Sequence, residues 1–149
     1  MILSDFKSFP RTGRILGIDW GLRRVGVAVS DPTRQFVFVR DVVFVPGDKA
    51  GAAQMVADVA LREGACGIVV GLPLFTDGTE STTTKMVRDF VADLEKKTDL
   101  PICLIEENLT SAIAQEEMGR VRVRDLKERL DSESARVILE NAIAMINRA

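Results

Sequence analysis

Three short β-type runs follow one another near the start of the chain, and the hydrophobic periodicity changes after them. The runs are RILGIDWG (14–21), RVGVAVSD (24–31) and QFVFVRDVVFV (35–45), with turn-type residues between them. Short apolar or alternating segments of this kind predict strands, and their short connections predict an antiparallel meander. Beyond residue 46, helix-type and strand-type segments alternate, which is typical of parallel strands joined by helices.

The later part of the chain is predicted to alternate between helices and strands. We expect helices over 49–64, from a capping Thr79 to about Lys97, over 109–119 and from Asp131 to the end of the chain, and strands over 65–73 and 100–108. Two helices have an apolar face at helical spacing: Met86, Val87, Phe90, Val91 and Leu94 in one, and Ala135, Ile138, Leu139, Ala142, Ile143 and Ile146 in the other. The predicted fold is therefore α/β, with a mixed sheet of about five strands and helices on both faces.

The length of 149 residues favours a single domain, which we assign to 14–149, with 1–13 as a short N-terminal extension. A content of 46% hydrophobic and 28% charged residues is typical of a soluble globular protein. No apolar run reaches the roughly 18 residues that a membrane span needs, and Asp5 and Lys7 interrupt any signal peptide. Two cysteines beside or within apolar runs favour buried, reduced thiols. We therefore expect a cytoplasmic protein that does not contact a membrane.

The chain has no histidine, which excludes histidine general bases and histidine-dependent triads. Acids instead lie at the carboxyl ends of predicted strands, where such sheets bind ligands. Asp19 ends the first run, Glu106 and Glu107 end the strand 100–108, and Asp131 opens the last helix. Three carboxylates from separate segments can hold two divalent cations, Mg²⁺ or Mn²⁺, that activate water for phosphodiester cleavage.

Each of these acids also has a purely structural interpretation. Asp19 can form an Asx turn before Gly21, and Asp131 is a good N-cap for the last helix. Strand alternation lets only one of Glu106 and Glu107 point inward, and the residues alone do not distinguish them. An ionised carboxylate at the end of a buried strand needs a compensating partner, which a turn or a bound cation can supply.

Four blocks of the sequence resemble the motifs of the YqgF/RuvX family of RNase H-like nucleases. The blocks are GRILGIDWGLRRVGVAVSD, VVGLPLFTDGTES, EENLTS and LDSESARVILENAI, and they span most of residues 14–146 in this order. The resemblance implies a compact RNase H-like fold and a nuclease that acts in 5′-end maturation of the 16S ribosomal RNA precursor or as a Holliday junction resolvase. It implies three catalytic, metal-binding acids: Asp19, Glu107 and Asp131. It also implies that glycines shape the first hairpin: Gly17, Gly21 and Gly26.

The chain departs from the family pattern at two positions. The family usually has Glu-Arg-x-Thr/Ser at the end of this strand, whereas Asn108 follows Glu107 here. Ile113 stands where the family often has a Glu that would complete a capping box with Thr110. A positive charge that could hold a phosphate is therefore missing at position 108, and arginines elsewhere are candidates to supply it.

Basic residues and hydroxyls are candidates for contacts with a nucleic acid. Segment 119–130 has five basic and two acidic residues in a chain of net charge −2. Its arginines alternate as in an extended arm along a phosphate backbone, although a solvated loop accounts for such a run equally well. Trp20 can stack on a base, but core packing is the commoner use of a tryptophan. The candidate nucleic-acid-binding residues are Arg23, Arg24, Thr79, Arg120, Arg122 and Arg124.

Two further classes of function stay open. A non-catalytic nucleic-acid-binding domain is favoured by Asn108 and Ile113, and it would bind without metal-dependent cleavage. Actin-like ATPases and sugar kinases also have Asp-x-Gly after a first strand, but they need two such domains, and this chain has no Walker A sequence. We predict a metal-dependent nuclease that binds precursor ribosomal RNA or branched DNA as a monomer or homodimer. A symmetric junction favours the homodimer.

Overall fold

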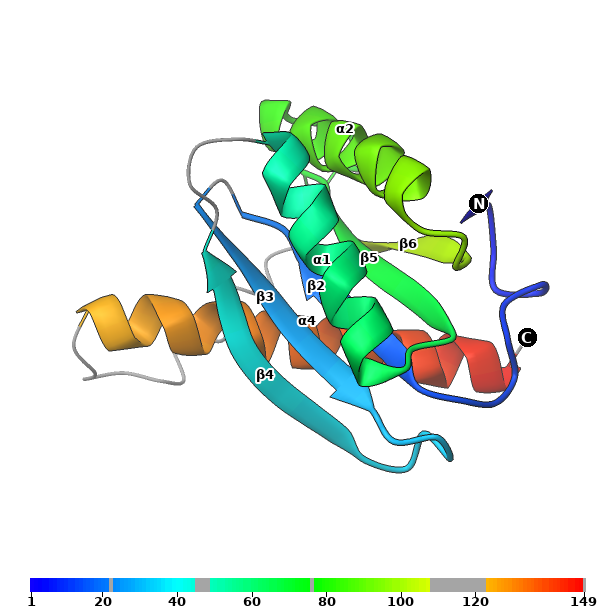
Figure 1. The fold of residues 1–149 in the computed structure, drawn as a ribbon. Helices are drawn as coiled ribbons and strands as arrows, with labels where there is room; N and C mark the ends of the chain where they lie inside the picture. Colours follow the sequence, from blue (N-terminus) through cyan, green and yellow to red (C-terminus); the bar gives the residue numbers. More distant parts are fainter. Residues whose placement is uncertain (22, 45–48, 76, 108–122, 149) are drawn as a thin grey trace.

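The computed structural model describes residues 1–149 except 22, 45–48, 76, 108–122 and 149, and it describes no side chains for 49, 50 and 123–132. Within these limits the chain forms one six-stranded mixed sheet with three helices (Figure 1). The strands are β1 (Ile2–Leu3), β2 (Ile15–Asp19), β3 (Arg24–Ser30), β4 (Val37–Phe44), β5 (Gly67–Pro73) and β6 (Ile102–Glu107). The helices are α1 (Lys49–Glu63), α2 (Thr82–Lys97) and α4 (Val123–Arg148).

The sheet has the order β1-β6-β5-β2-β3-β4. Strands β2, β3 and β4 form the expected antiparallel meander, and β5 and β6 run parallel to β2. The prediction of an α/β fold with a mixed sheet is therefore confirmed. As expected, the carboxyl ends of β2, β5 and β6 lie at one edge, because parallel strands end on the same side of a sheet.

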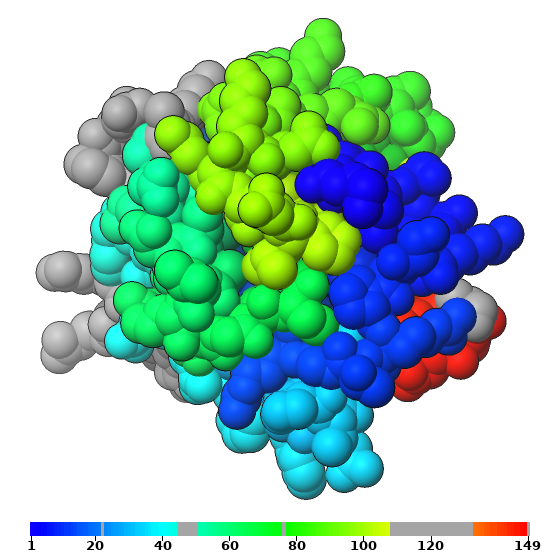
Figure 2. Space-filling model, turned by 45° about the vertical axis from the view of Figure 1, so that its right-hand side comes forward, coloured from blue at the N-terminus to red at the C-terminus, as the bar shows by residue number. Residues whose placement is uncertain are grey.

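The first thirteen residues add the sixth strand of the sheet. Strand β1 pairs in parallel with β6, and the backbone nitrogen of Ile2 donates to Glu95 on α2 over 2.9 Å. Phe6 and Phe9 are buried, and the Phe9 ring lies where a side chain on Gly67 would stand, 2.5 Å from that Cβ position. Figure 2 shows these residues, in blue, packed against the chain around α2 and β6. The N-terminal residues thus contribute to the hydrophobic core.

Helices cover both faces of the sheet, as predicted. Helices α1 and α2 pack together on one face, and α4 crosses the other (Figure 1). All six residues of the apolar face predicted from Ala135 to Ile146 of α4 are buried. That of α2 is buried except for Met86, which is partly exposed. No helix among the described residues is long and apolar enough to cross a membrane.

Two predicted helix starts differ from those in the structure. Helix α2 is capped by Ser81 and not by Thr79, because Ser81 and Thr84 form a reciprocal capping box. Helix α4 begins at Val123, so Asp131 lies inside the helix and the interpretation of Asp131 as its N-cap is wrong. The helix predicted over 109–119 lies outside the described residues.

Candidate active site at the carboxyl ends of the parallel strands

Asp19 lies at the end of β2 between two glycines. In the antiparallel pairing with β3, Asp19 stands directly opposite Gly26. In the parallel pairing with β5, Ile18 stands beside Val70, so Asp19 is level with Gly71. Neighbouring strands are about 4.8 Å apart, and neither neighbour has a side chain to cover the carboxylate. Asp19 therefore has a glycine on each of the two neighbouring strands.

The side chain of Asp19 faces the layer that contains α4. A Cβ on Gly17 would meet the Leu139 side chain of α4 at 2.8 Å, so Gly17 faces that helix. Successive strand residues alternate between faces, which puts Asp19 on the same side as Gly17. A Cβ on Gly71 would likewise meet Ile138 of α4 at 2.5 Å. Asp19 and Gly71 thus share one face of the sheet, at the edge where β2 and β5 end.

Glu107 brings a second carboxylate to the same place. Cys103 and Ile105 of β6 pack in the core beneath α4, so alternation directs Glu107 to that face as well. Its Oε2 lies 2.6 Å from the position that a Cβ on Gly71 would occupy. The carboxylate of Glu107 is therefore drawn back over β5, within about one strand spacing of Asp19.

Glu106 and Glu107, which the sequence could not tell apart, have different surroundings. Glu106 is exposed, whereas Glu107 is partly buried. Burial raises the pKa of the Glu107 carboxyl from its usual 4.5 to about 7, because the charged form loses its hydration. A bound cation would compensate this charge and lower the pKa again. Of the two acids, Glu107 has the surroundings expected for a metal ligand.

The described part of the chain supplies two of the three predicted acids. Asp131 belongs to α4, but its side chain lies outside the description. Among the described residues no group of three or more acids, cysteines or histidines could hold a metal ion. Ser134, fully buried, stands four residues before Ile138 and so on the same side of α4. Two hard carboxylates on one face are the donor type that Mg²⁺ and Mn²⁺ prefer.

Hydrogen bonds tie the loop after β5 to the end of β6. The backbone nitrogen of Leu74 donates to the carbonyl of Glu107 over 3.2 Å, and the hydroxyl of Thr84 donates to the carbonyl of Pro73. The first bond fixes the strand end that carries Glu107, and the second anchors the start of α2 beside it. The N-terminal end of α2 therefore lies near the candidate site, where its dipole favours anions.

The predicted nucleic-acid contacts are brought together only in part. Arg23 and Arg24 lie in the β2–β3 hairpin at the same edge of the sheet as Asp19, and Arg23 is exposed. Thr79 is exposed nearby, and its hydroxyl donates to Asp77 over 2.7 Å. Arg124 lies in the first turn of α4, so the prediction of an extended arm is wrong at that residue. Two other arginines, Arg120 and Arg122, lie outside the described residues.

Trp20 is part of the core and not an exposed stacking platform. It is 8% exposed, and its ring lies 6.3 Å from that of Phe90 on α2. Trp20 therefore packs in the core, which is the commoner role of a tryptophan. Gly21, the next residue, fits the tight hairpin, because a Cβ there would stand 2.5 Å from the carbonyl oxygen of Arg24. Gly17, by contrast, permits the close approach of α4 to the sheet.

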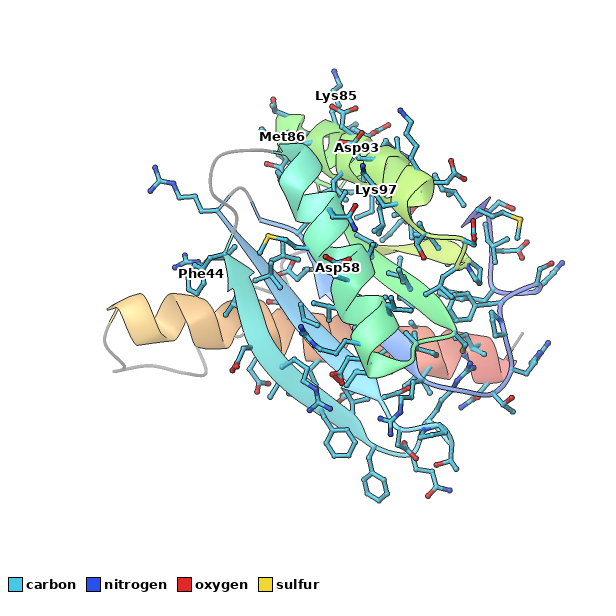
Figure 3. All side chains as sticks on the ribbon, viewed as in Figure 1. Phe44, Asp58, Lys85, Met86, Asp93 and Lys97 are labelled. Carbon is cyan, nitrogen blue, oxygen red and sulfur yellow. The ribbon has the colours of Figure 1, made fainter. Side chains whose placement is uncertain are left out.

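A groove of about 670 Å³ lies away from these acids, between the C-terminal ends of α1 and α2. Asp58 and Lys97, both labelled in Figure 3, are among its lining residues. It belongs to the layer of α1 and α2, whereas Asp19 and Glu107 face the layer of α4. The groove is therefore separate from the candidate site.

Comparisons with known proteins agree with this arrangement. The family model RuvX, described as "Holliday junction resolvase", matches residues 13–145. A protein of Maridesulfovibrio salexigens named "Putative pre-16S rRNA nuclease" is 39% identical over 133 residues, covering 88% of this chain and 98% of that protein. A protein of Acidiphilium cryptum with the same name is 31% identical over 148 residues, covering 97% of this chain and 93% of that protein. The T. thermophilus RuvC structure with a Holliday junction substrate is similar in fold, with a TM-score of 0.58 at 14% identity over 91% of this chain and 96% of that one.

Proposed function

Because this chain belongs to the RuvX family of Holliday junction resolvases, we propose that it is a nuclease that hydrolyses phosphodiester bonds with Mg²⁺ or Mn²⁺ bound by Asp19 and Glu107. One observation carries the assignment of the site. The Glu107 carboxylate is buried over Gly71, beside Asp19, with its pKa raised to about 7. Without a cation this arrangement destabilises the ionised form. With one, the same burial excludes water and strengthens the ion–carboxylate interaction.

The two acids would bind and orient the cation from neighbouring positions on one face. When bound, a divalent cation activates water for attack on phosphorus and stabilises charge on the leaving oxygen. Asp19 is held by a strand paired on both sides, and Glu107 ends a strand whose last carbonyl is bonded to Leu74. Rigid strand ends keep both carboxylates oriented before the substrate arrives. Gly26, opposite Asp19 on β3, adds no side chain beside it, and Gly71 gives its place to the Glu107 carboxylate.

Asp131 is the proposed third ligand. It precedes Ile138 by seven residues in α4, which is close to two helical turns. Ile138 contacts the position of Gly71, so the helical repeat brings position 131 to the side of α4 that faces the sheet. A third carboxylate from that helix would complete a set drawn from β2, β6 and α4. This assignment follows the family resemblance and the helical periodicity.

Precursor 16S ribosomal RNA is the substrate that we propose first. The relatives at 39% and 31% identity are named for that activity, and such an enzyme would act in the cytoplasm. A four-way DNA junction is the second candidate, because the description of the family model names it. Arg23, Arg24 and Thr79 would contact the phosphate backbone, and Arg120, Arg122 and Arg124 would add contacts from the next segment.

Cleavage of end-labelled precursor 16S RNA and of a four-way DNA junction tests the proposal. Each substrate is incubated with the protein in Mg²⁺, in Mn²⁺ and in EDTA, beside the Asp19→Asn variant. We expect cleavage of one substrate that needs the cation and that falls by roughly a hundredfold or more in the variant, the order of effect seen when a charge-stabilising group is removed. The preferred substrate decides between the two biological roles.

The variant also needs a control for folding. Asp19→Asn should melt at the same temperature as the natural chain or higher, because a carboxylate near Glu107 is replaced by a neutral group. Full cleavage by this variant would contradict the assignment of Asp19. Binding of RNA without cleavage in any metal would favour a non-catalytic binding domain, in agreement with Asn108 and Ile113.

A further inference from the structure

We propose that Cys66 is a site of oxidation by peroxides, at which the buried guanidinium of Arg34 stabilises the sulfenic acid formed on the sulfur. Cys66 stands just before β5, and its backbone nitrogen donates over 2.8 Å to the carbonyl of Arg14, just before β2. Cys66 therefore lies at the amino ends of the parallel strands. Asp19 and Glu107 lie at the opposite, carboxyl ends. The proposed oxidation site is thus separate from the candidate active site.

Arg34 is a buried cation whose donors are only partly used. It is 9% exposed, although it belongs to the turn between β3 and β4. Its Nε donates to the carbonyl of Gly13 over 3.0 Å, and its Nη2 lies 3.7 Å from Sγ of Cys66. Nη1 is buried without a hydrogen-bond partner in the part of the chain that the structure describes. Buried charges are usually paired, yet no carboxylate among the described residues forms an ion pair with Arg34.

Hydrogen bonds around the β3–β4 turn hold the backbone of Arg34. The carboxylate of Asp31 accepts from the backbone nitrogen of Phe36 over 2.8 Å, and the carbonyl of Asp31 accepts from the nitrogen of Arg34 over 3.0 Å. Arg34 has a φ of +63°, in the left-handed region that residues with a long side chain rarely adopt. A bond of 3.0 Å from the nitrogen of Gly13 to the carbonyl of Pro32 attaches the turn to the segment before β2 (Figure 2). The guanidinium is therefore held beside the sulfur before any reaction takes place.

The two cysteines of the chain differ in their surroundings. Cys66 is partly exposed, and its thiol donates to the carbonyl of Thr12 over 3.3 Å. Cys103 is 1% exposed, and burial raises the pKa of its thiol to about 11. Peroxides react with accessible cysteines through the thiolate form, so Cys103 should be inert. Cys66, by contrast, is accessible and has a positive charge near its sulfur.

The two cysteines are too far apart to form a disulfide with each other. Val69 of β5 stands beside Cys103 of β6, and Cys66 precedes Val69 by three residues. Three residues of extended chain span about 10 Å, whereas the Cα atoms of a disulfide are at most roughly 7 Å apart. A sulfenic acid on Cys66 therefore has no second thiol within the folded chain with which to condense. It must be stabilised where it forms.

The reaction is a two-electron oxidation of the sulfur by hydrogen peroxide. The thiol gives its proton to solvent, and the sulfur attacks one peroxide oxygen, so that an S–O bond forms and the O–O bond breaks. The departing hydroxide takes up a proton and leaves as water, and the sulfur is left as a sulfenic acid. When that acid is ionised, its oxygen is an anion beside Arg34, to which the guanidinium can donate. The product thus supplies the anion that the buried guanidinium lacks.

Trapping of the sulfenic acid tests the proposal. The natural chain is treated with hydrogen peroxide and an excess of dimedone, which bonds covalently to sulfenic acids, and mass spectrometry of the digested protein follows the adduct on each cysteine. We expect an adduct on Cys66 and none on Cys103 over the same time. Arg34→Gln should form the Cys66 adduct about tenfold more slowly, the order of effect of one hydrogen bond to a charged group.

Arg62→Gln is the matched control, because it removes an exposed positive charge from the last turn of α1. It should form the Cys66 adduct as fast as the natural chain. An adduct on Cys103 reveals a variant whose core has opened. If Arg34→Gln shows one, Arg34→Met replaces it, since methionine is uncharged and suits a buried position. Equal rates on Cys66 in the natural chain and the folded Arg34 variant, no adduct on Cys66, or equal labelling of both cysteines in the natural chain would overturn the proposal.

Discussion

At the scale of single residues, Glu106 and Glu107 differ in burial, and only Glu107 has the surroundings of the proposed cation ligand. The two carboxylates are adjacent in sequence, yet one is exposed and the other is drawn over Gly71. Because side chains alternate along a strand, one of the two acids must face inward. Which of them does so depends on which face of β6 packs against α4. That packing is long-range, so the sequence could not choose between them without the family resemblance.

The raised pKa of Glu107 predicts how the stability of the metal-free protein depends on pH. In the folded state the pKa is about 7, above the usual 4.5 of the unfolded chain. Protonated Glu107 therefore favours the folded state, and stability should fall as pH rises from about 4.5 through 7, by about 3 kcal/mol at most. Urea unfolding in EDTA at a series of pH values measures this change.

Glu107→Gln and Glu106→Gln form a matched pair for that measurement. Glu107→Gln should remove the loss of stability in this pH range, because its side chain does not ionise. Glu106→Gln should lose stability with rising pH as the natural chain does, because Glu106 is exposed. An unaltered pH profile in Glu107→Gln would show that another group causes the effect, or that Glu107 is hydrated.

Other residues show what sequence reasoning missed. Asp19 was predictable because a charge at the end of an apolar run needs compensation. The positions of Gly71 and Gly26 on either side of Asp19 depend on strand register, which no local pattern specifies. The sequence predicts that Asp131 opens the last helix, but α4 begins eight positions earlier, at Val123.

At the scale of helices and strands, most of the predictions are confirmed because their signals are local. The five predicted strands and the apolar faces of the helices follow from periodicity. Strand β1 was missed because it has only two residues and depends on pairing with β6, far along the chain. The sequence predicts Thr79 as the cap of α2, whereas Asp77 holds Thr79 in a turn and Ser81 caps the helix.

The contact between β5 and α4 can be tested at Gly71. In Gly71→Ala the added methyl group would stand 2.5 Å from Ile138 and 2.6 Å from the Glu107 carboxylate, so both must move. We expect a loss of about 1–3 kcal/mol in unfolding free energy, as for other overpacked positions, together with weaker Mn²⁺ binding. Urea unfolding and calorimetric titration measure the two effects.

Gly17→Ala is the control for that variant. Its methyl group would meet Leu139 of α4 at 2.8 Å but lies away from Glu107. It should lose at least as much stability, because the Cβ of Leu139 and the carbonyl of Ala135 cannot swing aside, while binding Mn²⁺ as before. Equal losses of Mn²⁺ affinity in both variants would mean that α4, and not the position of Glu107, controls the site.

At the scale of the whole molecule, the order of the sheet explains why residues 19 and 107 lie at the same edge. Strand β5 lies between β2 and β6, and its parallel pairing with both brings their carboxyl ends to one edge. The sequence predicted this edge from the alternation of helices and strands. It could not predict that Gly71 of the central strand would let the two carboxylates approach, because that depends on how α4 packs.

Calorimetric titration with Mn²⁺ tests most directly whether Asp19 and Glu107 together bind a divalent cation. We expect the natural chain to bind Mn²⁺, with at least about tenfold weaker binding in Asp19→Asn and in Glu107→Gln, since outer-shell changes alone cost this much at metal sites. Glu106→Gln should bind as the natural chain does. Equal affinity in the natural chain and Glu107→Gln, or a loss in Glu106→Gln alone, would show that Glu107 does not bind the cation.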